Sequence, residues 1–289
     1  MRSITSGLRR LLFLFCVWAL VVAGPGRPEA ASAGERPRSA APELVVVEQG
    51  GLPIILSAPH GGKEAIPGAP PRENKDAFRF LTGGDLHTLE LAQKVAAALE
   101  KRLHARPYLV LARFQRKYVD ANRAAQDAYE SPQAKPHYDA YHAALRAACQ
   151  EVARQWGRGL MVDLHGQSVE QEGIFRGTAS GASMGEAIER FGPGVLNGPN
   201  SIAGDLERRG YKLIPAANEG QKEGRFNGGY ITRTYGRREL SIDAIQLEFG
   251  AALRASQRLD RTASDVAAAI ETFARAYLPA SKLQPEKKR

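Results

Sequence analysis

Short apolar runs alternate along most of the chain with longer segments in which apolar residues recur at helical spacing. The short runs are rich in β-branched residues and predict strands at residues 43–49, 52–58, 108–114, 159–166, 211–217 and 242–250. Residues 85–105, 136–157 and 261–278 repeat apolar positions every three to four residues, which predicts helices. In the first of these helices, the face expected to be buried carries Leu86, Leu89, Val95, Leu99 and Leu103.

This alternation of strands and helices indicates the class of fold. Strands that are apolar throughout belong in a mainly parallel sheet whose two faces are both covered by helices. We therefore expect an α/β fold, a three-layer α/β/α sandwich around a mainly parallel, mixed sheet. Stretches rich in glycine and asparagine at residues 61–84, 173–201 and 217–229 are expected to be long loops. In open α/β sheets, loops at the carboxyl ends of the strands build the functional site.

The first 33 residues have the pattern of a secretory signal peptide. Arginines precede the apolar run "LLFLFCVWALVVAG", and the small residues "ASA" end at Ala33. The pattern predicts cleavage after residues 1–33 and export to the periplasm or the medium; an uncleaved anchor is the alternative, although the run is short for a membrane span. Residues 34–42 are expected to be a flexible leader, 43–279 a single domain and 280–289 a frayed tail.

Composition narrows the choice of partners. The chain has 289 residues and a formal net charge of +9, but it contains no block of lysine and arginine with interleaved aromatic residues. We therefore expect a small-molecule substrate and no nucleic acid, with no stable membrane anchor once the signal is cleaved. After that cleavage only Cys149 would remain, so no disulfide could form within the chain, and Cys149 itself is expected in the core. The sequence leaves the oligomeric state open.

Three ionisable residues lie at the ends of predicted strands: His60, His165 and Glu248. If these strands are neighbours, the three side chains converge. A lone histidine is more often structural, but two strand-end histidines that each precede a glycine favour a metal site. A catalytic zinc needs about three protein ligands and an open position for water. The third ligand could be Asp85, which could equally cap a helix, or Glu64 or His87.

Two further groups suggest roles around such a metal. In "RFQRKYVDANR", Arg116, Asn122 and Arg123 could hold the carboxylate of a substrate. Alternatively, Asp120 pairs with Arg116 or Arg123 in a surface network. Glu248 could accept the proton of an attacking water, or it could form a buried pair with an arginine.

Eight segments together resemble the N-formylglutamate amidohydrolase family, which is related in fold to zinc carboxypeptidases. They are "SAPHGG", "GGDLHT", "RKYVDANR", "YDAYHAALR", "LMVDLHG", "FRGTASG", "GGYITRTYG" and "AIQLEFG", within residues 44–255. The resemblance implies a zinc-dependent hydrolase, with one zinc per chain, that cleaves a formyl or acyl amide from an amino acid. It implies that the metal ligands are His60, Asp85 and His165, that Asn122 and Arg123 hold the substrate carboxylate, and that Glu248 is the general base. His142 matches a family position, but the resemblance assigns it no role.

The chain also departs from the family pattern. Gly166 and Gln167 stand where a serine usually follows the second histidine, and the loop "NEGQKEGRF" at residues 218–226 is longer. We therefore expect the ligand chemistry to be kept, with an N-formylglutamate-like acyl amino acid or a small peptide as substrate; iron or cobalt could replace zinc. One alternative, suggested by "HGGKEAIPGA", is a zinc-dependent N-acetylmuramoyl-L-alanine amidase that acts on peptidoglycan. Another is an inactive binding protein on the same scaffold.

Overall fold

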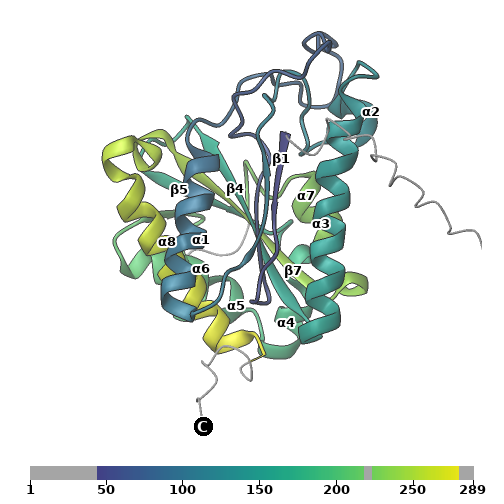
Figure 1. Cartoon of the computed structure of the whole chain (residues 1–289). Coiled ribbons are helices and arrows are strands. Elements are labelled where there is room, and N and C mark those ends of the chain that lie inside the picture. Colours follow the sequence, from purple (N-terminus) through teal and green to yellow (C-terminus); the bar gives the residue numbers. More distant parts are fainter. Residues whose placement is uncertain (1–43, 218–222, 280–289) are drawn as a thin grey trace, which may run out of the picture. The chain divides into compact units, whose positions relative to one another are not determined.

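A computed structural model describes residues 44–217 and 223–279 of the chain (Figure 1). The expected signal peptide, leader and tail, at residues 1–33, 34–42 and 280–289, lie outside the described residues. The structural account below therefore concerns the expected single domain.

Seven strands form one sheet in the order β1-β3-β2-β4-β7-β5-β6 within the described part of the chain. Their bounds are β1 Val45–Glu48, β2 Ile54–Ala58, β3 Tyr108–Ala112, β4 Gly159–Gln167, β5 Gly173–Gly177, β6 Lys212–Ile214 and β7 Ile242–Gly250. Four neighbouring pairs are parallel, and β1 with β3 and β5 with β7 are antiparallel. The expected mainly parallel, mixed sheet is confirmed.

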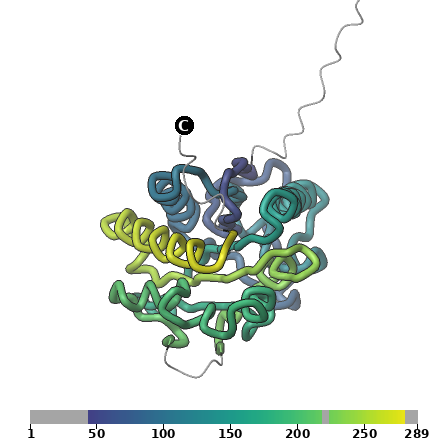
Figure 2. The backbone as a smooth tube through the Cα atoms, turned by 90° about the horizontal axis from the view of Figure 1, so that it is seen from below, coloured from purple at the N-terminus to yellow at the C-terminus, as the bar shows by residue number. Residues whose placement is uncertain are grey.

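Helices cover both faces of this sheet, as expected for a three-layer sandwich (Figures 1 and 2). The long helices are α1 Thr88–Leu103, α3 Lys135–Trp156 and α8 Ser256–Tyr277. The short ones are α2 Ala125–Ala128, α4 Gly185–Phe191, α5 Gly194–Asn197, α6 Ile202–Arg208 and α7 Tyr230–Tyr235. Helices α1, α6 and α8 pack together on one face, while α3 and α7 lie on the other.

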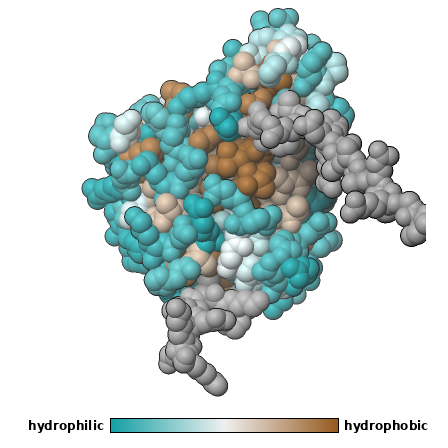
Figure 3. Space-filling view, viewed as in Figure 1, coloured by the Kyte–Doolittle hydropathy of each residue, from teal (hydrophilic) through white to brown (hydrophobic). Residues whose placement is uncertain are grey.

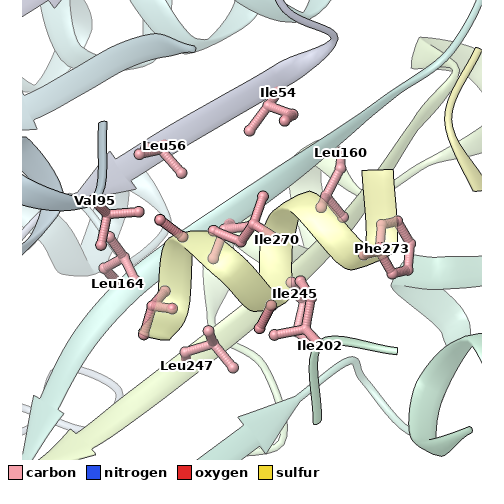
Figure 4. Packing of buried hydrophobic residues seen from close by; sticks show 14 of the residues in the cluster. Ile54, Leu56, Val95, Leu160, Leu164, Ile202, Ile245, Leu247, Ile270 and Phe273 are labelled. Atoms are coloured by element: carbon pink, nitrogen blue, oxygen red, sulfur yellow. The ribbon is translucent and has the colours of Figure 1, made fainter. Parts of the chain in front are cut away.

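The side-chain period of two along each strand divides the apolar residues between two cores. In β2, Leu56 packs against α1 and α8, whereas its neighbour Ile55 packs against α3. The same division holds in β4, where Leu160 and Val162 face one core and Met161 the other. Figure 4 shows the first core, in which Ile270 of α8 lies among apolar side chains of several strands. The three central strands are therefore held rigidly from both sides.

Three details differ from the sequence-based expectations. Residues 173–201, expected to be a loop, contain β5, α4 and α5, because this stretch is glycine-rich yet has buried apolar residues such as Ile174 and Val195. Helix α8 begins at Ser256, five residues before the expected start at Arg261. Leu86, expected on the buried face of α1, precedes that helix and is 63% exposed.

The surface carries little apolar area outside a few places. On the face shown in Figure 3, hydrophobic residues gather near the middle, where edge strand β1 runs, and hydrophilic residues cover most of the rest. Within residues 44–217 and 223–279, no helix combines the length and the apolar character needed to cross a membrane.

The packing of α8 gives a first prediction. Ile270 is fully buried, so Ile270→Ala should lower the free energy of unfolding by about 2–5 kcal/mol through lost burial and a residual cavity. Val47 is 51% exposed on β1, and Val47→Ala should change it by less than about 1 kcal/mol. Urea titration of both variants measures the difference; equal effects would mean that α8 does not pack as described.

Candidate metal centre

Strands β2, β4 and β7 are consecutive in the sheet, so the condition for convergence of the strand-end residues is met. His60 follows β2 by two residues, and His165 and Glu248 lie near the carboxyl ends of β4 and β7. The register of the parallel pair β4–β7 sets His165 directly beside Glu248. Since both side chains project from the same face of the sheet, they reach a common space.

Three donor atoms converge at this place. His60 Nδ1 lies 3.2 Å from His165 Nδ1 and 3.2 Å from Asp85 Oδ2, and the distance from His165 Nδ1 to Asp85 Oδ2 is 3.4 Å. Neighbouring ligands of a tetrahedral zinc bound at roughly 2.0–2.1 Å are separated by about the same distances. All three residues are buried, and they form the group of side chains that could hold a metal ion.

The opposite nitrogen of each imidazole faces a buried aspartate. His60 Nε2 lies 2.7 Å from Asp120 Oδ1, and His165 Nε2 lies 2.7 Å from Asp163 Oδ2. A carboxylate holds the imidazole proton on the nitrogen that faces it, so both Nδ1 atoms present lone pairs toward each other and toward Asp85. Three acceptors that face one another repel unless a cation lies between them. The donor set therefore fits a divalent metal ion.

The pKa values of these groups reflect the same charge distribution. Burial alone would raise the pKa of Asp85, but the nearby His60 and His165 hold it well below its usual value. Burial would lower the pKa of His165, yet Asp163 and Asp85 raise it well above 6.5. In the absence of a metal, the surroundings of His165 therefore favour its positively charged form.

Two glycines after His60 let the chain turn into this position. A Cβ atom on Gly61 would lie 2.4 Å from the backbone nitrogen of Leu89, at the start of α1. On Gly62 it would lie 2.3 Å from the carbonyl oxygen of Arg113, just after β3. A side chain at either position would force this backbone or its neighbours at Leu89 and Arg113 to shift.

Among the three candidates for the third ligand, the structure brings Asp85 to the two histidines. Its carboxylate also accepts a hydrogen bond from the backbone nitrogen of Gly166 at 3.1 Å, so it does not cap α1 as the alternative supposed. Glu64 instead pairs with Arg113 at the surface. The ring of His87 contacts the carbonyl oxygen of Arg254 at 2.9 Å.

Glu248 is 6% exposed and its Oε1 accepts a hydrogen bond of 2.9 Å from Gln246 Nε2. Burial raises its pKa to about 7, while the positive charge of His165 acts in the opposite direction. A carboxylate with this pKa can exchange a proton near neutral pH, which is what a general base needs.

The expected carboxylate clamp is mostly engaged with the protein. Arg116 donates to Asp120 Oδ2 from Nε and Nη2 at 2.9 and 2.8 Å, so the alternative pairing occurs, although Asp120 is fully buried and not on the surface. Arg123 donates to the carbonyl oxygens of Phe78, Asn122 and Arg79. Asn122 accepts a hydrogen bond from the backbone nitrogen of Ile231, which leaves its Nδ2 3.3 Å from His165 Nε2.

The residues that orient His165 were not expected from the sequence. Asp163 lies two positions earlier on β4, and its other oxygen accepts a hydrogen bond of 2.7 Å from Ser57 Oγ. Ser57 Oγ is 2.8 Å from the hydroxyl oxygen of Tyr141 on α3. An aspartate and a histidine two residues apart on a strand share a face, so the spacing "DLH" was the signal that could have revealed Asp163.

The candidate centre opens into a cavity of about 750 Å³. Its lining includes His60, Asp85, His165 and Glu248 at one end, and loop residues from 79–84, 166–169 and 224–229. Five arginines line it: Arg79, Arg116, Arg123, Arg225 and Arg254. Because Asp85 and Glu248 are the acidic residues of this lining, the cavity favours an anionic ligand.

His142 is outside the cavity and has a structural role. On α3, its Nε2 lies 3.0 Å from the carbonyl oxygen of Ala121 and its Nδ1 lies 2.9 Å from the hydroxyl of Tyr235 on α7. It therefore ties two helices to the backbone beside Asn122. Cys149, on the same helix, is fully buried as expected, and burial raises its pKa to about 12.

Comparisons with a family model and with a curated protein both point to enzymes that act on N-formylglutamate. A family model described as N-formylglutamate amidohydrolase matches residues 133–254, which include His165 and Glu248. The N-formylglutamate deformylase of Pseudomonas aeruginosa is 25% identical over 243 residues, spanning 71% of this chain and 83% of that protein.

Two solved structures share the fold. The N-formylglutamate amidohydrolase from Ralstonia eutropha JMP134 has a TM-score of 0.53 at 16% identity, over 81% of this chain and 97% of that one. A gene product from Agrobacterium tumefaciens has a TM-score of 0.51 at 15% identity, over 81% of this chain and 94% of that one.

The environment of His142 leads to a prediction about acid stability. Burial lowers its pKa to about 4, so between pH 6.5 and 4 the unfolded chain binds a proton that the folded chain does not. As the pH is lowered through this range, the free energy of unfolding should therefore decrease. This group contributes at most about 1.4 kcal/mol of that decrease per pH unit. In His142→Gln the fall should be smaller. Urea titrations from pH 7 to 4, with chelator present, compare the two proteins; parallel curves would contradict the prediction.

Proposed function

Because the chain belongs to the N-formylglutamate amidohydrolase family, we propose that it is a metal-dependent amidohydrolase that cleaves the N-formyl or N-acyl amide of an amino acid or small peptide. In this proposal His60, Asp85 and His165 hold one zinc ion. The observation that carries it is the convergence of three metal-compatible donor atoms beside a buried glutamate, at the end of a cavity rich in arginine.

The proposed reaction divides the chemistry between the metal and the chain. Bound zinc would supply a Lewis acid that polarises the scissile carbonyl and acidifies water. Glu248 accepts the proton of the attacking water and returns it to the amine that leaves, so the carboxylate starts and ends the cycle unprotonated. Asp120 and Asp163 keep the two imidazoles oriented through the cycle.

The cavity also indicates what part of the substrate it holds. Excess positive charge favours a substrate with a free carboxylate, as an acyl amino acid has. Arg123, however, is bound to three carbonyl oxygens, so its first effect is to position the loop at residues 78–79. Arg79 and Arg225 are exposed at the cavity and can meet a carboxylate directly.

We further propose that the protein is exported, on the basis of the n-region, apolar run and small residues in positions 1–33. Amino-terminal sequencing of the protein recovered from outside the cytoplasm would show a start near residue 34. A start at Met1 in a membrane fraction would instead favour the uncleaved anchor.

The ligand set predicts metal content. The purified protein should contain about one equivalent of zinc, and His165→Ala should lose it because one of three ligands is gone. His87→Ala is the matched control, since that ring contacts a carbonyl oxygen and should leave the zinc in place. Elemental mass spectrometry measures all three. If the wild-type protein binds no metal even after zinc is added, the proposed centre does not exist.

If Glu248 is the general base, its substitution should lower the rate of hydrolysis without loss of the metal. Glu248→Gln should keep its zinc and lower kcat on N-formyl-L-glutamate by roughly 10²–10⁴-fold, because the amide cannot accept a proton. Glu64→Gln, at the surface, should leave kcat unchanged. A chromatographic assay of released amino acid measures both. If Glu248→Gln retained full kcat, another group would have to be the base. If the wild-type protein released stem peptides from peptidoglycan and did not act on acyl amino acids, the muramoyl amidase alternative would be favoured.

A further inference from the structure

Exposed apolar side chains line the cavity or belong to residues next in the chain to those that line it. Among the described residues, the large hydrophobic side chains with high exposure include Phe78, Leu81, Leu86 and Val169, which are 62%, 54%, 63% and 53% exposed. Leu81 and Val169 line the cavity, Phe78 precedes the lining residue Arg79, and Leu86 follows the lining residue Asp85. Single exposed apolar residues are ordinary, but a group at a cavity points to a ligand.

The first part of this group lies on a loop whose backbone is fixed by buried charge. Arg72, 4% exposed, donates from Nη2 to the carbonyl oxygen of Leu81 at 2.5 Å. Its guanidinium also lies 5.2 Å from the ring centroid of Phe80, and Arg123 holds the carbonyl oxygen of Phe78 at 3.2 Å. The backbone carbonyl groups of Leu81 and Phe78 are thus held by guanidinium groups, while the side chains of both residues stay exposed.

The second part is presented by Gln167, one of the departures from the family pattern. Gln167 is 5% exposed, and its Oε1 accepts hydrogen bonds from the backbone nitrogens of Val169 and Glu170 at 2.7 and 2.8 Å. Its Nε2 donates to the carbonyl oxygen of Glu170 at 2.7 Å. One buried side chain thus closes the turn that carries Val169 at the cavity.

The other departure from the family pattern, Gly166, makes room for the side chain of Arg254. A Cβ atom on Gly166 would lie 2.4 Å from Cζ of Arg254, so that guanidinium packs directly on the glycine. Arg254, 6% exposed, donates to the carbonyl oxygens of Leu86 and Phe249. The backbone at Leu86 is therefore also fixed by a buried cation.

The interior of the cavity continues this apolar surface. Phe80 and Phe226 line it together with Leu81 and Val169. Its volume of about 750 Å³ lies in the range, roughly 300–1,000 Å³, of pockets that enclose drug-sized ligands, so it can hold a ligand larger than N-formylglutamate.

From these contacts we infer that the cavity contains an apolar subsite, formed by Leu81, Val169, Phe80 and Phe226, that takes the alkyl chain of an N-acyl amino acid. This inference rests on the proposed amide hydrolysis and specifies its substrate class: a carboxylate that the arginines attract, an amide at the candidate metal centre, and an apolar acyl chain of several carbons. The apolar chain gains binding energy by covering side chains that are otherwise exposed to water.

A series of substrates tests the subsite. The zinc-loaded protein is assayed with N-formyl-, N-acetyl-, N-butanoyl-, N-hexanoyl- and N-octanoyl-L-glutamate. We expect kcat/KM to rise with chain length, by up to about fourfold per added methylene until the subsite is filled. In the double variant Leu81→Ala with Val169→Ala, the ratio of kcat/KM for the hexanoyl and acetyl substrates should fall by roughly tenfold.

The control is Val47→Ala, an exposed apolar residue on β1 that does not line the cavity, and it should leave the dependence on chain length unchanged. Hydrolysis of N-formyl-L-glutamate with no gain for longer chains, or a gain that survives the double variant, would overturn the subsite while leaving the proposed function intact. If the zinc-loaded protein hydrolysed none of the five substrates, both the subsite and the proposed function would be wrong.

Discussion

The balance of buried charge is the constraint on which the candidate centre depends. The carboxylates of Asp85, Asp120 and Asp163 are all buried: Asp85 contacts both imidazoles, Asp120 contacts that of His60, and Asp163 contacts that of His165. An ionised carboxylate is strongly disfavoured inside a protein unless positive charge or hydrogen-bond donors surround it. Arg116 compensates Asp120 and lies 3.7 Å from Asp85, and Ser57 donates to Asp163. A cation bound between the imidazoles and Asp85 would add to this compensation and would stabilise this part of the fold.

The sheet register converts this requirement into geometry. Because β2, β4 and β7 are parallel neighbours, Ser57, Asp163 and Gln246 form one row across them, and His165 and Glu248 form the next. Residues of the first row hold those of the second: Asp163 orients His165, and Gln246 donates a hydrogen bond to Glu248. Polar residues are thus placed in strands where apolar ones would pack, on the face covered by α3. Tyr141 of that helix completes the network by contacting Ser57.

Much of this arrangement could be predicted from the sequence, and the remainder has identifiable causes. Periodicity predicted β2, β4 and β7. Because His60, His165 and Glu248 each lie at the carboxyl end of one of these strands, they were expected at one edge of the sheet. Strand β5 was not predicted, because "GIFRG" is short and flanked by glycines, which favours a loop. Pairing with β7 makes it a strand. The contacts of Arg123 with Arg79 and of Arg254 with Leu86 could not be predicted, because these acceptors are backbone carbonyls far away in the sequence, which no spacing rule reveals.

The two departures at Gly166 and Gln167 show how chemistry and recognition are separated in this molecule. Strands β4 and β7 carry His165 and Glu248, while His60 follows β2 and Asp85 precedes α1. The surrounding loops are instead set by buried polar side chains that bind loop backbone, such as Gln167 and Arg254. With Gly166 and Gln167 after it, His165 keeps its contact with Asp163, and Gln167 fixes the turn that carries Val169. A change beside the metal centre can therefore alter what the cavity accepts without altering the atoms proposed to carry out the reaction.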